Sequence, residues 1–420
     1  MKQTYIERDI EEKIAKFLKI RQIIALVGPR RSGKTTYLQN LKTKLPNSLY
    51  MSFEDQKVLD LFTQDIESFT KIYLSKVDYL IIDEFHYAKK GGKQLKYLFD
   101  FYPKLKIIIS GSSAVDLTIK AIKYLVGRVV VFPLMPFSFR EFLKAKDRNL
   151  FAYYQNLKIK SFFEVNKKGS AVLDRFNNLL EEYILFGGYP EVVLEKDREV
   201  KKTLLNQIYS LYFLKEVRDI LGLIDDYKLK LLIKALSLQT GNICQFQELS
   251  RISGFSTPTL KKYLNFLEKT FISFFIKPYF TNKRTELSKN PKVYFFDLGF
   301  RNTVIDNFLS FDKRSDRGGL LENFVAGHFI TKHSLNFWRS KSKAEVDFIV
   351  EKEGNLTPIE VKSTLFKSVL SQSLSSFIRK YRPKKAFLFS LNYFGKRRVG
   401  NTNVFFLPIF LSQIVIGSRI

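Results

Sequence analysis

The 420-residue chain is poor in the residues that build disulfide frameworks and zinc sites. It has one cysteine, Cys244, and three histidines, His86, His328 and His333. A single cysteine excludes an intramolecular disulfide, and so few cysteines and histidines argue against a structural zinc site. This cysteine usage suits a reducing compartment, and we expect a cytoplasmic protein.

Long apolar runs are missing as well. No uninterrupted run approaches the roughly 20 residues that a membrane-spanning helix needs. The longest stretch, 404–416, contains Pro408, Ser412 and Gln413, and we expect a core strand and a short helix there. The first residues are charged and hold no apolar signal segment, and no internal repeat is evident.

Acidic residues are few beside basic ones. The chain has 70 Lys and Arg against 41 Asp and Glu, a formal net charge of +29. The excess is +11 in residues 1–150, +5 in 151–280 and +13 in 281–420. Such a charge favours a polyanionic partner, nucleic acid before an anionic membrane surface, unless the lysines only solvate the surface.

A phosphate-binding loop is the most informative motif. The apolar run Ile23–Val27 precedes G-x-x-x-x-G-K-T and a helical stretch, in the order strand, loop, helix. Glycines at both loop ends allow close backbone approach, and the N–H groups and the helix N-terminus face the phosphates. The sequence therefore predicts an ATP site formed by Gly28, Pro29, Arg30, Arg31, Ser32, Gly33, Lys34, Thr35 and Thr36.

Four side chains have specific roles in this prediction. Lys34 supplies a positive charge to the β- and γ-phosphates, and Thr35 supplies a hydroxyl to Mg²⁺. Asp83 and Glu84 end a second apolar strand. We expect Asp83 to hold Mg²⁺, directly or through water, and Glu84 to act as the general base on the attacking water. A second catalytic acid favours an ATP hydrolase over a GTPase-like switch.

Two serines follow a further apolar strand. Ser110 or Ser112 is expected to hydrogen-bond the γ-phosphate or the attacking water, and the alternative is a turn that merely needs serine and glycine. Short apolar strands alternate with helical stretches here, which predicts a parallel sheet with helices on both faces. Ligands bind at the carboxyl ends of such strands, where Lys34, Asp83 and Ser110 all fall.

Residues 225–283 have the pattern of a winged helix. Two helical stretches are joined by a tight turn at Gly254, as in a helix-turn-helix. One hypothesis places Thr259, Lys261 and Lys262 in a major groove of DNA. The other is a structural or partner-binding winged helix.

The last part of the chain has a spacing typical of metal-dependent phosphodiesterases. Asp347, Glu360 and Lys362 form D-x(12)-E-x-K, and Glu322 lies in a helix upstream. Glu322, Asp347 and Glu360 are expected to hold Mg²⁺, while Lys362 is not a ligand but orients or activates water. The alternatives are charges alternating on an exposed strand, and a nuclease-like fold that only binds.

Together these motifs resemble a prokaryotic family of AAA-type P-loop ATPases, widespread in archaea, with a C-terminal restriction-endonuclease-like (PD-(D/E)XK-like) domain. Besides the two ATPase motifs, the resemblance is carried by Phe-Gly-Gly-Tyr-Pro-Glu at 186–191, Leu-Glu-Asn at 321–323, Glu-Val-Asp-Phe at 345–348 and Ile-Glu-Val-Lys at 359–362. It implies that Arg128 is a catalytic arginine finger or sensor, the alternative being a surface arginine that closes a strand pair. Val346 stands where the nuclease motif has its proline.

The expected fold class is therefore α/β. We expect a P-loop NTPase (AAA-like) core in 1–145, a helical region in 146–224, a winged helix in 225–283 and a restriction-endonuclease-like domain in 284–420. The expected function is ATP hydrolysis with Mg²⁺ in an enzyme that acts on DNA, and a homo-oligomer is one possible assembly. The alternative is an ATP-driven switch or scaffold, in defence or signalling, whose C-terminal fold binds a protein partner without cleavage. A third hypothesis is an ATPase that associates with an anionic membrane surface.

Overall fold

The computed structural model describes residues 5–88, 91–111, 124–157, 170–210, 217 and 226–417. The chain divides into two compact units, which are described separately. The first unit consists of Met1–Glu141, Tyr189–Glu191 and Asn265–Ile272, and the second of Phe142–Gly188, Val192–Leu264 and Ser273–Ile420. The division into four segments stays a prediction.

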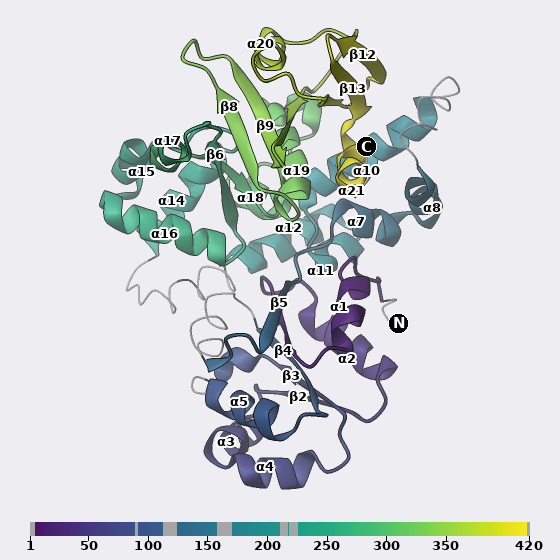
Figure 1. Cartoon of the computed structure of the whole chain (residues 1–420), viewed down its shortest axis with the longest axis vertical. Helices are drawn as coiled ribbons and strands as arrows, with labels where there is room; N and C mark the ends of the chain where they lie inside the picture. Colours follow the sequence, from purple (N-terminus) through teal and green to yellow (C-terminus); the bar gives the residue numbers. More distant parts are fainter. Residues whose placement is uncertain are drawn as a thin grey trace. The chain divides into compact units, whose positions relative to one another are not determined.

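The first unit alternates strands and helices in sequence (Figure 1). Its elements are α1 (Glu11–Leu18), β1 (Ile23–Val27), α2 (Lys34–Lys44), β2 (Ser48–Ser52), α3 (Gln56–Gln64), α4 (Ile66–Tyr73), β3 (Tyr79–Asp83), the short 3₁₀ helix η1 (Phe85–Tyr87), α5 (Gly92–Phe101), β4 (Lys106–Gly111) and β5 (Val129–Pro133). The strands form one sheet in the order β2-β3-β4-β1-β5, and every neighbouring pair is parallel. The predicted parallel α/β core is thereby confirmed.

Both faces of this sheet are covered, which explains why β1 is apolar throughout. Ile23, Ala25 and Val27 pack in a core with side chains of α3, α4 and α5. Ile24 and Leu26 point the other way, because side chains alternate along a strand, and pack with α1 and α2. Helices on both faces leave the carboxyl edge of the strands as the open edge of the sheet.

The second unit is larger and mixed. Its helices are α8 (Arg148–Asn156), α10 (Ser170–Phe186), α12 (Arg198–Gln207), α14 (Tyr227–Leu238), α15 (Phe246–Ser253), α16 (Thr257–Lys269), α17 (Lys283–Ser288), α18 (Leu298–Val304), α19 (Arg317–Ile330), α20 (Gln372–Tyr381) and α21 (Ser412–Gly417), of which α16 ends in the first unit. The helices α7 (Phe139–Lys146) and α11 (Pro190–Leu194) also run from one unit into the other.

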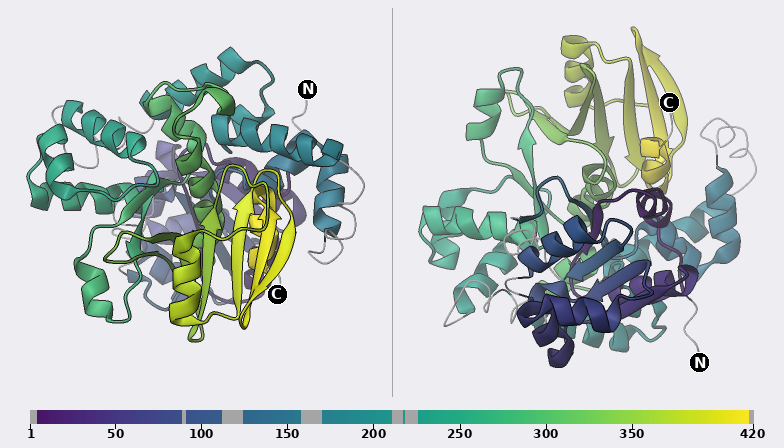
Figure 2. Two further views of the ribbon diagram at one scale, coloured as in Figure 1. Left: turned by 90° about the horizontal axis from the view of Figure 1, so that it is seen from above. Right: turned by 60° about the horizontal axis from the view of Figure 1, so that its bottom comes forward.

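The strands of the second unit form a single sheet (Figure 2). They are β6 (Ser273–Pro278), β7 (Lys292–Phe295), β8 (Leu335–Arg339), β9 (Glu345–Lys352), β10 (Asn355–Val361), β11 (Lys385–Ser390), β12 (Gly395–Val399) and β13 (Thr402–Pro408), in the order β12-β13-β11-β10-β9-β8-β6-β7. Parallel and antiparallel pairs are mixed. The sheet includes β6, so it runs across the boundary predicted at residue 283.

The helix pair expected in 225–283 is present. Helix α15 ends at Gly254, whose φ of 68° is the left-handed conformation that glycine adopts without strain. Helix α16 follows, with Leu260 and Leu267 fully buried and Lys261 and Lys262 exposed. In the part of the chain that the structure describes, no helix has the length and apolar character to cross a membrane.

Candidate active site

The loop between β1 and α2 has backbone geometry that only glycine allows at two positions. Gly33, the N-cap of α2, has φ 92°, a conformation strained for any side chain. A Cβ on Gly28 would clash with the carbonyl oxygen of Leu134, so the backbone that follows β5 leaves no room for a methyl group at this position. The two glycines therefore shape the loop for different reasons, one by torsion and one by contact.

Gly28→Ala should deform the loop and remove nucleotide binding, because the backbone at Leu134 cannot recede without disturbing the sheet. We expect a loss of about 1 to 3 kcal/mol in the free energy of unfolding, as for overpacking in a core. Thermal melting with and without ATP measures both effects. The control is Gly327→Ala in α19, where an added Cβ meets nothing within 4 Å. Equal behaviour of the two variants would show that the loop tolerates a Cβ.

Lys34 is buried at the first position of α2. Its ammonium donates hydrogen bonds to the carbonyl oxygens of Gly28 (3.0 Å) and Pro29 (2.9 Å). These partners hold the charge directly over the loop that precedes it. Thr35 and Thr36, the next two residues, are exposed at the same helix end.

The loop fits an anion such as a phosphate group. No side chain caps the N-terminus of α2, so its first N–H groups remain available beside a partial positive charge. The hydroxyl oxygen of Ser32 is fully buried and has no hydrogen-bond partner among the described residues. A buried hydroxyl without a partner is costly, and a phosphate oxygen would satisfy it.

Asp83 is the last residue of β3, and hydrogen bonds reach both oxygens of its carboxylate. It is 2% exposed, and Tyr50 donates to its Oδ2 at 2.9 Å. The hydroxyl of Ser110, at the end of β4, donates to Oδ1, and the backbone N–H of Glu84 lies 3.1 Å from the same oxygen. A carboxylate amid hydroxyl groups is a set of hard oxygen atoms, which suits Mg²⁺. Ser112, the other serine of the prediction, lies outside the described residues.

Glu84 follows in an unusual backbone conformation. Its φ of 52° is rare for a residue with a side chain, and such strain clusters at functional positions. Burial raises the pKa of Glu84, but the neighbouring His86 and the charges of Lys34 and Arg30 outweigh burial and lower it. Glu84 is therefore ionised at neutral pH, as a general base must be. The Nδ1 atom of His86 lies 3.0 Å from the carboxylate.

A second charged cluster lies in the second unit and contains the four residues predicted as a nuclease site. Lys362, directly after β10, lies 2.8 Å from Glu360, and Ser371 donates to the other oxygen of Glu360 at 2.8 Å. Burial lowers the pKa of Lys362, but the charges of Glu360, Asp347 and Glu322 raise it overall. The carboxylate of Asp347 accepts the backbone N–H of Val361 at 2.7 Å.

A buried lysine that the sequence did not single out neutralises this cluster. The Lys292 side chain on β7 is 3% exposed, and its ammonium lies 3.7 Å from Glu322 and 2.5 Å from Glu345. Burial lowers the pKa of Lys292, but Glu322, Asp347 and Glu345 raise it overall, so the lysine stays charged. Tyr294 also donates to Glu322, at 3.2 Å.

The role of Glu322, Asp347 and Glu360 as ligands of one metal ion stays a prediction, although the charges of both glutamates reach Asp347. Within residues 5–417, apart from the gaps in the description, no three Asp, Glu, His or Cys side chains meet in a group that could hold a metal ion. Two groups already engage these carboxylates: the Lys292 ammonium lies 3.7 Å from Glu322, and a backbone N–H donates to one oxygen of Asp347. Burial, reinforced by the charge of Glu322, raises the pKa of Asp347 well above its usual value.

Lys292→Met should destabilise the second unit, because it leaves buried carboxylates without their counter-charge. Breaking a buried ion pair in this way costs about 3 to 5 kcal/mol. The carboxyl groups would ionise less readily in the folded variant. The loss in the free energy of unfolding should therefore be largest at neutral pH and should shrink as the pH falls and the carboxyl groups protonate. Denaturant unfolding at several pH values measures this.

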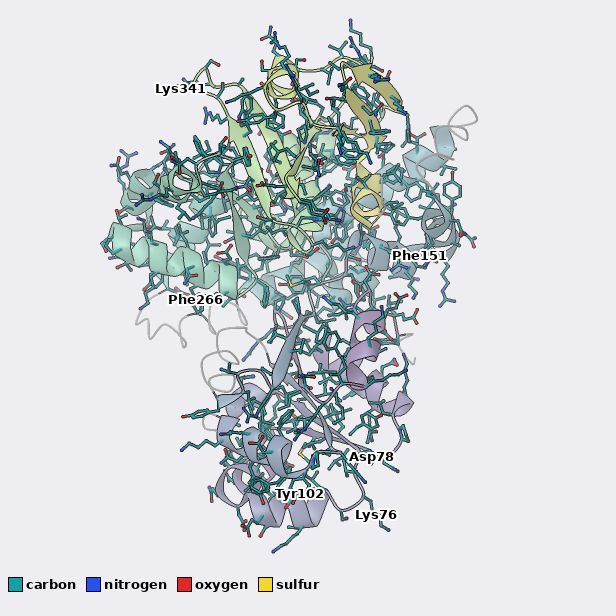
Figure 3. All side chains as sticks on the ribbon, in the orientation of Figure 1. Lys76, Asp78, Tyr102, Phe151, Phe266 and Lys341 are labelled. Carbon is teal, nitrogen blue, oxygen red and sulfur yellow. The ribbon has the colours of Figure 1, made fainter. Side chains whose placement is uncertain are left out.

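The matched control is Lys341→Met in the turn between β8 and β9, where the side chain is exposed (Figure 3). It should change stability by less than about 0.5 kcal/mol. A Lys292→Met protein as stable as the control at neutral pH would contradict the counter-charge interpretation.

Residues 20–143 match a protein family described as an AAA domain. This part of the chain is an AAA-type domain. Residues 177–310 and 317–410 match two families described only as domains of unknown function. The descriptions of these two families name no activity for the part of the chain that follows the AAA domain.

Sequence relatives extend the similarity over most of the chain. An uncharacterised protein of Haemophilus influenzae is 27% identical over 382 residues, which is 86% of each chain. One of Methanocaldococcus jannaschii is 26% identical over 83% of this chain and 76% of its own. A solved Walker-type ATPase of Pyrococcus abyssi covers 73% of this chain and 99% of its own, with a TM-score of 0.46 and 16% identity.

Sequence reasoning missed a buried arginine that supports the loop of the AAA domain. Arg8 donates to the carbonyl oxygens of Ser32 (3.0 Å) and Met135 (2.7 Å), and its Nε lies 3.0 Å from Glu141. Glu141 also accepts the backbone N–H of Ser138 at 2.8 Å. Nothing in the sequence marks Arg8, because its partners lie 24 to 133 residues away.

Three residues far along the chain also belong to the first compact unit. The segment Tyr189–Glu191 is part of the same compact unit, and Glu191 pairs with Arg31 of the loop at 3.0 Å. A Cβ on Gly33 would lie 3.6 Å from the ring of Pro190. The resemblance pointed to 186–191 as a motif but assigned it no chemistry.

Arg128 lies at the opposite end of the sheet from the loop. Its carbonyl oxygen accepts the N–H of Ile23, the first residue of β1, whereas the loop follows the last residue of that strand. Its guanidinium lies 3.2 Å from Asp100 and is one-third exposed. The structure therefore corrects the interpretation of Arg128 as a sensor in its own AAA domain. A finger directed at a neighbouring copy stays a prediction.

Proposed function

We propose that the chain binds ATP with Mg²⁺ at the loop 28–35, hydrolyses it, and acts on DNA. One observation carries the proposal: an uncapped helix end, a buried lysine and an ionised glutamate with positive φ lie together at one edge of the sheet. These are the parts that a P-loop hydrolase needs in order to position phosphates and water.

In this proposal each side chain has one task. Lys34 exchanges the carbonyl oxygens of Gly28 and Pro29 for oxygens of the β- and γ-phosphates. Thr35 and Asp83 would hold Mg²⁺, directly or through water. When bound, the ion would neutralise part of the phosphate charge. The hydroxyl of Ser110 keeps Asp83 in place.

The proposed hydrolysis is a direct attack by water. Glu84 orients the water and accepts its proton while the water oxygen bonds to the γ-phosphorus. The bond between the γ-phosphorus and the bridging oxygen breaks, and ADP leaves. A neighbouring copy would have to supply Arg128, so an arginine finger at this position would require a homo-oligomer.

The proposed action on DNA rests on charge and on the exposed helix pair. The net charge of +29 favours a polyanion, and Thr259, Lys261 and Lys262 lie at the start of α16. The test is ATP turnover measured with and without single-stranded, duplex and branched DNA. Stimulation by any of these would support the proposal. Turnover unchanged by all three, without salt-dependent DNA binding, would overturn it.

A second candidate function is an ATP-driven switch or scaffold. It is favoured by the buried Lys292, which supplies positive charge to Glu322 and Glu345 in the acidic cluster of the second unit. A restriction-endonuclease-like fold neutralised in this way would bind a partner without cutting DNA. In that case ATP turnover would respond to a protein partner and not to DNA.

A further inference from the structure

The last part of the chain carries positive charge without any compensating acid. Residues 361–420 contain 11 Lys and Arg and no Asp or Glu. This stretch follows Glu360 directly and includes α20 and strands β11, β12 and β13. The stretch itself supplies no acid to pair with these cations, so the positions of the basic residues decide what its surface can bind.

Three of the basic side chains share one face of the sheet. Strand register sets Lys385 opposite Asn403, and Asn403 opposite Arg398. Two residues along, Lys396 lies opposite Phe405. Residues directly opposite one another on neighbouring strands point to the same face, and so do residues two apart. Lys385, Lys396, Arg398, Asn403 and Phe405 therefore form one surface, here called the basic face.

The other face of these strands is a core and is unavailable. Ala386 and Val404, from the intervening row, are fully buried with Leu374 and Phe377 of α20. The basic face thus lies on the side that α20 does not cover. The three strands lie side by side at the end of the sheet, where β12 is the edge strand (Figure 2).

The cations of the basic face are open to solvent. Lys396 and Arg398 are exposed and Lys385 is half-buried. Among the described residues, no carboxylate pairs with any of the three. The Lys396 ammonium lies 5.5 Å from the centre of the half-buried Phe405 ring. Neighbouring strands are about 4.8 Å apart, so Lys385 and Arg398 start about 10 Å from one another.

We propose that the basic face binds the phosphate backbone of DNA. The proposal rests on the proposed action on DNA and adds a surface for it, distinct from helix α16. Unpaired cations arranged in rows suit a linear polyanion, and a partly exposed aromatic ring among them offers a surface for an unstacked base. A lipid bilayer fits less well, because the aromatic side chains of this face are half-buried or buried and none protrudes.

The test compares three variants of the full chain. The first is Lys385→Gln/Lys396→Gln/Arg398→Gln, and the second is Lys261→Gln/Lys262→Gln. The third is the matched control Lys57→Gln/Lys71→Gln/Lys76→Gln, which removes three exposed lysines from the first unit, including Lys76 of Figure 3. Circular dichroism and thermal melting establish that each variant is folded.

Binding of a labelled short duplex and a labelled single strand is titrated between about 50 and about 200 mM salt. The plot of log affinity against log salt should lose about 1 unit of slope for each phosphate contact removed, so about 2 to 3 units in the first variant. The control should keep the slope of the unchanged protein. An unchanged slope in the first variant would overturn the basic face while leaving the action on DNA in place.

Two further outcomes separate this inference from the proposed function. If the unchanged protein binds neither DNA, the proposed action on DNA fails, and the basic face as a DNA surface fails with it. The same proteins are then sedimented with vesicles of phosphatidylserine. Vesicle binding that is lost in the first variant, without DNA binding in the unchanged protein, would reassign the basic face to a membrane surface and overturn the proposal.

Discussion

Replacing Lys34 with alanine should abolish ATP hydrolysis. The ammonium of Lys34 is buried against the loop, where it donates to two loop carbonyl oxygens, whereas the other buried cation at the loop, Arg8, is engaged by Glu141. Arg31, an exposed cation of the same loop, pairs with Glu191 and lies too far out to replace it. The measurement is release of phosphate from ATP, together with binding of a fluorescent ATP analogue.

The control for this variant lies on the same helix. Lys42 is exposed near the end of α2, so Lys42→Ala removes an equal charge at a distance from the loop. It should keep the turnover of the unchanged protein. Normal turnover by Lys34→Ala would remove the nucleotide site from this loop altogether.

Replacing Glu84 with glutamine should separate binding from turnover. The amide occupies the volume of the carboxylate and leaves Lys34 and Asp83 in place, so ATP should still bind. It cannot accept a proton from water, and turnover should fall by about two to four orders of magnitude. Single-turnover hydrolysis and equilibrium binding of ATP measure the two effects independently.

Glu54→Gln supplies the matched comparison for Glu84. Glu54 lies just after β2, near the same edge of the sheet, but it is exposed. The same chemical change there should leave turnover intact. If Glu84→Gln also turns over at the normal rate, the base is another group and the assignment of the acidic pair is wrong.

The α/β fold class and the AAA-type domain could be predicted because their signals are local. The run Ile23–Val27, the glycine-bounded loop and the acids at the end of β3 each lie within a few residues, so hydrophobic patterning and spacing suffice. The structure then sets Asp83 and Ser110 in contact. Strand order brings them together, since β3 and β4 are neighbours in the sheet.

The features that escaped prediction depend on contacts between distant parts of the chain. Lys292 looks like any lysine at the start of a strand, and only the folded sheet buries it beside Glu322 and Glu345. The spacing of Asp347 and Glu360 predicts a metal site, but spacing cannot reveal the buried lysine that lies beside this cluster. Arg128 was assigned by resemblance, which does not say at which end of the strand it lies.

The contacts of Arg8 also bear on where the AAA domain begins. The family match starts at residue 20, yet the guanidinium of Arg8 is a hydrogen-bond donor to the loop at Ser32 and the partner of the buried Glu141. A chain shortened to residue 20 would leave Glu141 buried and unpaired, at a cost of about 3 to 5 kcal/mol. Proteolysis or alternative initiation between residues 8 and 20 would thus remove a support of the loop 28–35 and leave its sequence motif unchanged.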